Sequence, residues 1–174
     1  NTGWVGDYKG IPMLYAERDH HALALASTPP WLARSVGFVG FSDGWQQLQA
    51  DRRLDRTYLR AENGNIAVTG EIDLQTSNGA FVMALGFGPT AMEAGQHTLI
   101  TLLEDFDETQ SEYVRAWRAW HKRRDRHSPS SISPRPLVAP SAAVLRMHES
   151  KRVEGGVIAS LSIPWGFSKG DDDL

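Results

Sequence analysis

Two acidic side chains come nearest to a catalytic arrangement in this chain. Glu71 and Asp73 stand two positions apart in a segment that alternates apolar and polar residues, so one strand face should carry both carboxylates. At about 3.3 Å rise per residue, their Cβ atoms would lie about 7 Å apart. Hydrolysis of a glycosidic bond with inversion uses two carboxyl groups about 6.5 to 9.5 Å apart. However, any polar strand face produces such pairs, and nothing nearby predicts the apolar pocket that raises the pKa of a general acid. We therefore favour a structural role for both residues.

Two other groups carry metal-binding side chains. His20 and His21 are adjacent, and neighbours on a strand point to opposite faces, so a polar turn is preferred over a chelating pair. Asp171, Asp172 and Asp173 could offer oxygen ligands to calcium, but three consecutive acids lack the spacing of a calcium-binding loop. A solvated acidic loop is the preferred interpretation, and we assign no metal ligand.

The elements that must position these residues are mostly strands. Asn63-Gly64 and Asn78-Gly79 each precede an apolar run, which is the strongest short-range signal for a hairpin turn. They predict three consecutive antiparallel strands within residues 60–89. In the middle strand apolar and polar residues alternate, so one of its faces is apolar from Ile66 onward. The third strand, over residues 81–87, is apolar on both faces, so we expect it inside a sandwich.

Further strand and turn signals recur along residues 1–104. Strands are expected at residues 13–18, 22–26, 35–41 and 97–103, with a loop or edge strand over 1–9, a turn over 91–95 and a short helix or irregular segment over 45–54. Gly37 and Gly40 suggest the close approach of another backbone. About eight strands with regularly spaced turns predict an antiparallel β-sandwich.

After Asp105 the spacing of the apolar residues changes from that of a strand to that of a helix. Thr109 and Glu112 fit a capping box, and aromatic residues then recur at helical spacing, which predicts a helix over residues 109–125. Such a stripe could stack on sugars, but it more often belongs to a core that pins the helix to the sandwich or to a next domain. The cations that end this helix favour a solvated helix end over a nucleic-acid patch. They are Lys122, Arg123, Arg124, Arg126 and His127.

A second domain boundary follows the helix. Residues 128–140 contain four prolines and four serines, which is the composition of a stiff, extended linker. A short helix is expected over residues 141–151, a break at Gly155-Gly156, and an extended apolar segment over 157–163. This apolar tail must pack on the sandwich, on another copy or on further chain.

Composition excludes several classes of protein. The chain has 174 residues, of which 41% are hydrophobic and 22% charged, which suffices for a sizeable core. The net charge of −3 gives no global attraction to nucleic acid or to an anionic membrane. There is no cysteine, so disulfides and thiolate metal sites are excluded. No apolar run approaches the length of a membrane span and no signal peptide is visible. The first residue is Asn1, so the chain looks like a piece of a longer polypeptide, and the compartment stays open.

Several long strings resemble one enzyme family. They are SDGWQQL at 42–48, ENGNIAVTGEIDL at 62–74, FVMALGFG at 81–88 and VLRMHESKRVEGGVIASLSIPWGFSKGDDDL at 144–174. Together they resemble the bacterial glucoamylase and glucodextranase branch of glycoside hydrolase family 15. The resemblance implies a β-supersandwich over residues 1–104, a helix and linker over 105–140, and the truncated start of a catalytic (α/α)6 barrel over 141–174. The expected fold class is therefore mainly β, with an antiparallel sandwich, a helical linker and the first segment of a helical barrel.

The resemblance also implies a function for the parent enzyme. Family members release glucose from the non-reducing ends of α-glucans with inversion and need no cofactor. Their Trp-Pro-Arg-Asp motif and two catalytic glutamates follow beyond the position of Leu174, so this chain is expected to support catalysis rather than perform it. Trp165 is the one residue expected to border the sugar pocket. The expected partner is an α-glucan held by the rest of the enzyme, with self-association of the truncated chain, and with neither nucleic acid nor membrane.

A second hypothesis comes from a different class. The sandwich could be a non-catalytic carbohydrate-binding or interaction module. An exposed row of aromatic side chains on the sheet would favour that module, whereas buried aromatics would favour the support domain. The tryptophans are dispersed among apolar neighbours, which favours burial.

Overall fold

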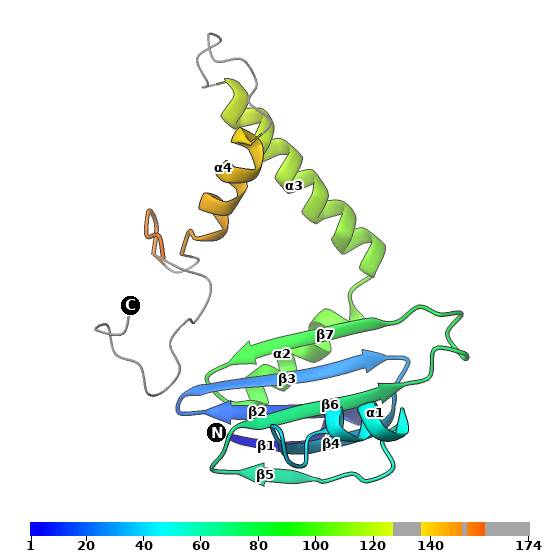
Figure 1. Cartoon of the computed structure of the whole chain (residues 1–174). Coiled ribbons are helices and arrows are strands. Elements are labelled where there is room, and N and C mark those ends of the chain that lie inside the picture. The colour runs from blue at the N-terminus through cyan, green and yellow to red at the C-terminus, as the bar shows by residue number, and fades with distance from the viewer. Residues whose placement is uncertain (127–136, 151–152, 159–174) are drawn as a thin grey trace. The chain divides into compact units, whose positions relative to one another are not determined.

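The computed structural model describes residues 1–126, 137–150 and 153–158 (Figure 1). The chain divides into two compact units, Asn1–Glu112 and Tyr113–Leu174. The described residues form seven strands and four helices. None of these helices is both long and apolar enough to cross a lipid bilayer. The fold is mainly antiparallel β-structure with several helices, as expected from the sequence.

A five-stranded antiparallel sheet, here the large sheet, is the main element of the first unit. Its strands lie in the order β5-β1-β2-β3-β7, so the first three strands of the chain pair in sequence. Alanine and glycine occupy one face of β3 and β7, which lets a helix approach that face closely. The bounds are β1 (Thr2–Tyr8), β2 (Ile11–Arg18), β3 (His21–Thr28), β5 (Arg60–Glu62) and β7 (Val82–Gly88).

A two-stranded antiparallel sheet, here the small sheet, covers part of the opposite face of the large sheet. It consists of β4 (Trp31–Phe38) and β6 (Ile66–Ile72). Between the two sheets, Leu14 and Val36 are fully buried. Arg34 crosses from the small sheet and donates hydrogen bonds to the carbonyl oxygens of Gly6 and Met13 on the large sheet. Apolar burial and these bonds hold the two sheets as a sandwich.

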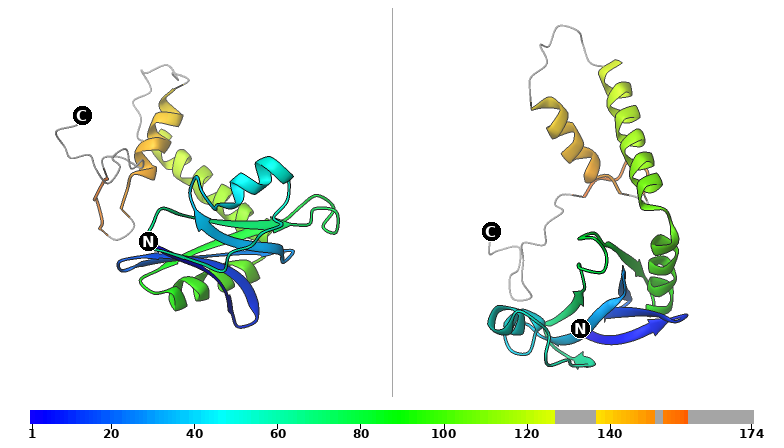
Figure 2. Two further views of the ribbon diagram at one scale, coloured as in Figure 1. Left: turned by 60° about the horizontal axis from the view of Figure 1, so that its bottom comes forward. Right: turned by 90° about the vertical axis from the view of Figure 1, so that its right-hand side faces the viewer.

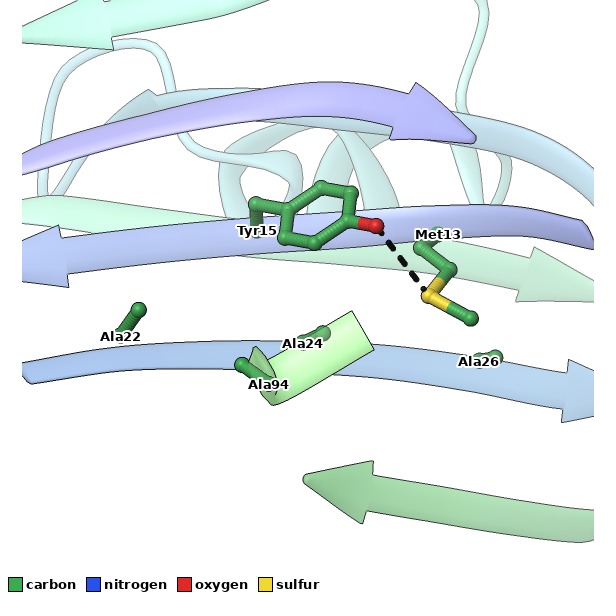
Figure 3. Close-up of a cluster of buried hydrophobic side chains, with 6 residues drawn as sticks. All are labelled: Met13, Tyr15, Ala22, Ala24, Ala26 and Ala94. Atoms are coloured by element: carbon green, nitrogen blue, oxygen red, sulfur yellow. Dashed lines mark hydrogen bonds between the residues drawn. The ribbon is translucent and has the colours of Figure 1, made fainter. Parts of the chain in front are cut away.

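Helices cover the two outer faces of this sandwich (Figure 2). Helix α2 (Ala91–Leu103) packs on the large sheet, where Ala94 and the alanines of β3 form one buried cluster with Met13 and Tyr15 (Figure 3). Helix α1 (Gly44–Asp51) lies on the small sheet, where Gly44 touches Thr69 so closely that a Cβ would overlap it. The order of layers is therefore helix, large sheet, small sheet, helix.

The predicted run of three consecutive antiparallel strands is wrong. β5 pairs with β1, β6 pairs with β4 and β7 pairs with β3, so none of the three pairs with another. The turn chemistry itself was correct, because Asn63 and Asn78 both have positive φ angles of 58° and 53°. These turns transfer the chain between sheets instead of closing hairpins. Local turn signals report backbone conformation, whereas strand partners are set by long-range packing.

The third of these strands also differs from expectation. β7 is an edge strand of the large sheet and not an interior strand of the sandwich. Ala84 and Gly86 are buried under α2, whereas Met83, Leu85 and Phe87 on the other face are 54%, 48% and 62% exposed. Both faces are apolar, but only one is covered within the described residues.

The turn over 91–95 and the strand over 97–103 are wrong as well, because both belong to α2. Thr90 caps this helix by accepting a hydrogen bond from the amide of Glu93, 3.2 Å away. Thr98, Ile100 and Thr101 are β-branched and favour a strand, but tertiary packing overrides that preference. The fully buried Thr98 hydroxyl is within 2.9 Å of the Ala24 carbonyl oxygen and 2.8 Å of the Ala94 carbonyl oxygen. Other predictions hold in part: β2 and β3 fall on predicted strands, whereas β4 ends at Phe38 and β1 is an inner strand instead of a loop or an edge. A Cβ on Gly37 would overlap the Ser42 carbonyl, as expected, but Gly40 has a φ of +78° and open space around it, so the close approach predicted there is wrong.

The second unit begins inside a long helix, α3 (Phe106–Arg126). The predicted helix is confirmed but starts earlier, because Asp105 and not Thr109 caps it, through a 2.8 Å hydrogen bond from the amide of Glu108. Trp117 and Trp120 meet edge to face with ring centroids 5.6 Å apart. Tyr113 is 64% exposed, so the aromatic stripe is a core in part only.

A shorter helix, α4 (Val138–Met147), lies within the second unit and coincides with most of the predicted helix over 141–151. Arg146 reaches the rings of Trp117 and Trp120 from α4, with distances of 5.9 Å and 5.2 Å to their centroids. Beyond α4, Glu149 and Val157 form an antiparallel bridge around a turn in which Gly155 has a φ of +73°. The predicted glycine break is therefore a tight turn.

Candidate functional site

The two carboxylates that spacing brings together are both engaged with the backbone. Glu71 lies on β6, and its Oε2 accepts a hydrogen bond of 3.1 Å from the amide of Leu54. Asp73 follows the end of β6 and accepts a 2.8 Å hydrogen bond from the amide of Gln75, which closes a turn. Each carboxylate therefore accepts a hydrogen bond from the backbone amide of a loop residue. This arrangement favours the structural role over catalysis by this pair.

Glu71 belongs to a set of polar side chains that fix the irregular segment 52–59 against the small sheet. The side chain of Gln47 bonds both the amide and the carbonyl of Arg56, and it is buried. The fully buried hydroxyl of Ser35 accepts a 3.0 Å hydrogen bond from the amide of Tyr58. Buried polar atoms are costly unless they are paired, and here they are paired with loop backbone. These residues hold a connection in place and leave no free reactive group among them.

The two adjacent histidines occupy a hairpin. His20 lies in the turn between β2 and β3, and His21 is the first residue of β3; both are exposed. Residues 1–126, 137–150 and 153–158 contain no group of three or more side chains placed to bind one metal ion. Trp165 and the acids Asp171, Asp172 and Asp173 lie outside the described residues, so their predicted roles remain predictions.

Tyr15 is the titratable side chain most altered by its surroundings in the sandwich. It is buried between the large sheet and α2, stacks on Trp4 with ring centroids 5.2 Å apart, and donates a hydrogen bond to the sulfur of Met13 at 3.4 Å (Figure 3). Burial raises the pKa of Tyr15, and the negative charge of Asp7 and the neighbouring Tyr8 raise it further. A phenol enclosed in this way packs the core and is unsuited to exchange protons with a substrate.

Two of the concavities on the described residues are informative about function. The first has a volume of about 290 Å³ and lies at the start of β3, where Leu23, Ile66 and Phe87 meet Glu17 and His21. Its lining is mainly apolar and also includes the charged side chains of Glu17 and Arg18. The second has a volume of about 350 Å³ and lies between α3 and α4, lined by side chains of both helices. These residues are Tyr113, Val114, Trp117, Arg118, His121, Ala143 and Met147.

Neither concavity contains a paired acid and base from the described residues. The first carries Glu17 as its carboxylate, and the second carries none. Inverting hydrolysis requires two carboxyl groups on opposite sides of the bond. The first concavity was missed at the sequence level because it depends on β6 and β7 entering different sheets. The helical spacing of Tyr113 and Trp117 was the available signal for the second.

Comparisons with known proteins cover most of the chain. The family model described as Glucodextranase, domain N, matches residues 1–122. A glucoamylase of Clostridium sp. (strain G0005) is 34% identical over 173 residues, which are 99% of this chain and 24% of the relative. A crystal structure of a bacterial glucoamylase complexed with acarbose superposes with a TM-score of 0.79 at 33% identity, over 95% of this chain and 24% of that one. The chain thus spans about a quarter of the length of these relatives.

Proposed function

The chain belongs to the glucodextranase domain N family, and we propose that it is the non-catalytic support portion of a glucoamylase-like enzyme. The enzyme would hydrolyse α-glucans from their non-reducing ends with inversion and release glucose. The observation that carries the proposal is the match of nearly the whole chain to one quarter of a glucoamylase, in sequence and in fold.

The contacts of the described residues are consistent with a supporting role for this chain and with catalysis by the rest of the enzyme. The best-spaced carboxylates, Glu71 and Asp73, hold loop amides. Catalysis then falls to chain outside residues 1–174, and the sandwich supplies a rigid body on which that chain is positioned. Rigid support matters because catalytic groups displaced by about 1 Å lose about a hundredfold in rate.

The proposal includes a domain scheme for the parent enzyme. Residues 1–104 form the sandwich, residues 105–140 the helix and linker, and residues 141–174 the start of the catalytic barrel. Trp165 borders the glucan pocket once the barrel is complete. A glucan is the partner of the complete enzyme, and the isolated chain self-associates through apolar surface that the rest of the enzyme would cover.

The alternative, a carbohydrate-binding module, has less support in the sandwich. Trp4 and Trp31 pack into the two cores, whereas Trp45 is 64% exposed, against the expected burial, but stands on α1 and not on a sheet. The exposed apolar row on β7 contains Met83 and Leu85 next to Phe87, and aliphatic side chains lack the flat π-surface on which sugars stack.

Glucose release tests the proposal. The 174-residue chain and the complete polypeptide encoded by the same gene would be incubated side by side with maltotetraose and with isomaltotriose. We expect glucose only from the complete polypeptide, and the preferred sugar identifies the linkage. Glucose from the 174-residue chain would overturn the proposal. If both proteins are inactive and the short chain binds maltotetraose in calorimetry, the binding module becomes the better account.

A further inference from the structure

The two Asn-Gly pairs of the chain differ in how their backbone is held. Asn78 and Gly79 both have positive φ angles, 53° and 77°, and the Gly79 amide donates a 2.8 Å hydrogen bond to the Leu74 carbonyl oxygen. Asn63 shares the positive φ, at 58°, but it lies in the short connection between β5 and β6. The second pair is therefore held in a hydrogen-bonded turn, whereas the first belongs to an open crossover between sheets.

The reactive groups of the first pair are both unengaged. The side chain of Asn63 is exposed. Within the part of the chain that the structure describes, neither this side chain nor the Gly64 amide has a hydrogen-bond partner. Glycine has no Cβ, so no side chain shields its nitrogen from the asparagine that precedes it. A free carboxamide and an unpaired backbone amide are thus consecutive in the chain.

We propose that Asn63 is a site of spontaneous deamidation, converted chiefly to isoaspartate, and that the turn around Asn78 protects the second pair. Asparagine is among the thermolabile residues of proteins. The glycine nitrogen that attacks the asparagine side chain must give up its proton. At Gly79 the hydrogen bond to Leu74 opposes that loss, whereas no described residue accepts a hydrogen bond from the Gly64 amide.

The reaction needs only the chain and water. The Gly64 nitrogen bonds to Cγ of Asn63, the bond from Cγ to Nδ2 breaks, and Nδ2 leaves as ammonia with the proton of the Gly64 amide. Water then opens the five-membered imide and supplies the oxygen of the new carboxylate. Cleavage at the main-chain carbonyl carbon gives isoaspartate, and cleavage at Cγ gives aspartate. Nothing is oxidised or reduced in either step.

Isoaspartate lengthens a connection whose two ends are fixed. Residues 63–65 join β5 of the large sheet to β6 of the small sheet (Figure 1). Glu62 pairs with Thr2 at one end, and the Asn65 carbonyl accepts a 2.9 Å hydrogen bond from the Val39 amide at the other. Isoaspartate inserts one carbon atom into the main chain between these anchors. The modification therefore weakens the attachment of one sheet to the other, independently of any catalytic activity.

Peptide mapping tests the selectivity between the two pairs. The 174-residue chain would be incubated at mildly alkaline pH, folded in buffer and unfolded in concentrated urea, and then digested for mass spectrometry and isoaspartate detection. In the folded chain, Asn63 should react at least about fivefold faster than Asn78, because one amide hydrogen bond opposes the reaction at Asn78. In urea that bond is lost, so the two rates should agree within about twofold.

Three outcomes of the mapping would overturn the proposal. The first is that Asn63 reacts no faster than Asn78 in the folded chain, and the second is that Asn63 does not react there at all. The third is a preference for Asn63 that persists unchanged in urea, because the turn would then not protect Asn78.

Matched substitutions test the effect on the fold. Asn63→Gly and Asn78→Gly each remove a carboxamide and keep a residue that tolerates positive φ. After incubation until most of Asn63 has reacted, the unsubstituted chain and Asn78→Gly should each lose at least about 4 °C in Tm. Asn63→Gly, incubated equally long, should lose less than about 2 °C. Equal losses in all three proteins would contradict the role of Asn63. If Asn63→Gly does not fold, mapping of the unsubstituted chain still decides.

A further variant separates the new charge from the longer main chain. Freshly prepared Asn63→Asp carries the carboxylate on an unaltered backbone, so its Tm should lie within about 2 °C of the fresh unsubstituted chain. A loss in Asn63→Asp as large as that of the incubated chain would assign the effect to charge and would contradict the role of isoaspartate.

Discussion

The carboxylate of Glu71 ties the segment that follows α1 to the small sheet. Its bond to the Leu54 amide spans 17 positions of sequence, so its loss would free one end of the segment 52–59. Glu71→Ala should lower the free energy of unfolding by about 1 to 2 kcal/mol, because a partly buried amide loses its acceptor. Glu71→Gln keeps an acceptor oxygen and should cost less than half as much. Urea unfolding measures both, and equal losses would contradict the role of this bond.

Tyr15 makes the stability of the sandwich sensitive to alkaline pH. Its pKa is raised by burial and by Asp7, so the folded state holds the phenol proton after the unfolded chain, with a pKa of about 10, has released it. The stability that the protonated phenol contributes is complete below about pH 10 and is lost as pH rises through the folded-state pKa. Tyr15→Phe should therefore flatten the fall in unfolding free energy above about pH 10.

A control substitution separates the phenol from its sulfur acceptor. Met13→Leu removes the thioether that accepts the Tyr15 hydrogen bond and nearly conserves volume. Because burial is the main cause of the raised pKa, this variant should keep the alkaline slope of the unsubstituted protein. If Tyr15→Phe and the unsubstituted chain lose stability in parallel above pH 10, the phenol does not control the slope.

At the level of elements, the close contact between α2 and β7 is possible because Gly86 has no side chain. A Cβ on Gly86 would overlap the Ala94 carbonyl oxygen and lie 2.6 Å from the Thr98 nitrogen. Both atoms belong to helix backbone, which cannot move without lifting α2 from the sheet. Gly86→Ala should cost about 3 kcal/mol or more of unfolding free energy.

A matched glycine on β1 provides the comparison for this contact. A Cβ on Gly6 would lie 3.1 Å from the nearest atom, an edge carbon of the Tyr15 ring, so a shift of only a few tenths of an ångström would relieve the contact. Gly6→Ala should therefore cost less than about 1 kcal/mol. Urea unfolding of the two variants measures the difference. Similar costs would show that α2 does not hold β7 by close backbone approach.

Sequence reasoning succeeded at this level where the signal was local. The hairpin of β2 and β3, the positive φ at Asn63 and Asn78, and the long helix after Asp105 were all predictable from short segments. It failed where a partner far along the chain decided the outcome. β6 pairs with β4 across the irregular segment that follows α1, and no turn residue encodes that choice.

The sequence also contained signals for α2, where a turn and a strand had been predicted. Thr90 and Glu93 have the spacing of a capping box, and Ala91, Ala94 and Thr98 recur at helical intervals. Thr98, Ile100 and Thr101 in the same segment are β-branched and favour a strand. Placement of the candidate carboxylates was partly predictable: Glu71 lies on the predicted strand, whereas its bond to Leu54 requires knowledge of the loop.

At the level of the whole molecule, family membership was recognisable from four long stretches of sequence. Neither the spacing of apolar residues nor the composition could have indicated it. The comparisons agree with that resemblance over residues 1–122 for the family model and over nearly all of the chain for the glucoamylase. Composition alone indicated an ordinary globular chain, as it would for many unrelated folds. The sequence did not reveal that Met83, Leu85 and Phe87 on β7 are exposed, because apolar residues on both faces of a strand predict that both faces are buried.

The activity of Glu71→Gln in the complete polypeptide tests the central claim most directly. Glu71 is the best-spaced acidic candidate in this chain, and the claim is that it supports the fold and takes no part in the reaction. Removing a general acid or base costs about a hundredfold to ten-thousandfold in rate. The account predicts that kcat and kcat/KM for maltotetraose stay within about twofold of the unsubstituted enzyme. A fall of a hundredfold in kcat, with the fold intact by circular dichroism, would contradict it and place catalysis on this sandwich.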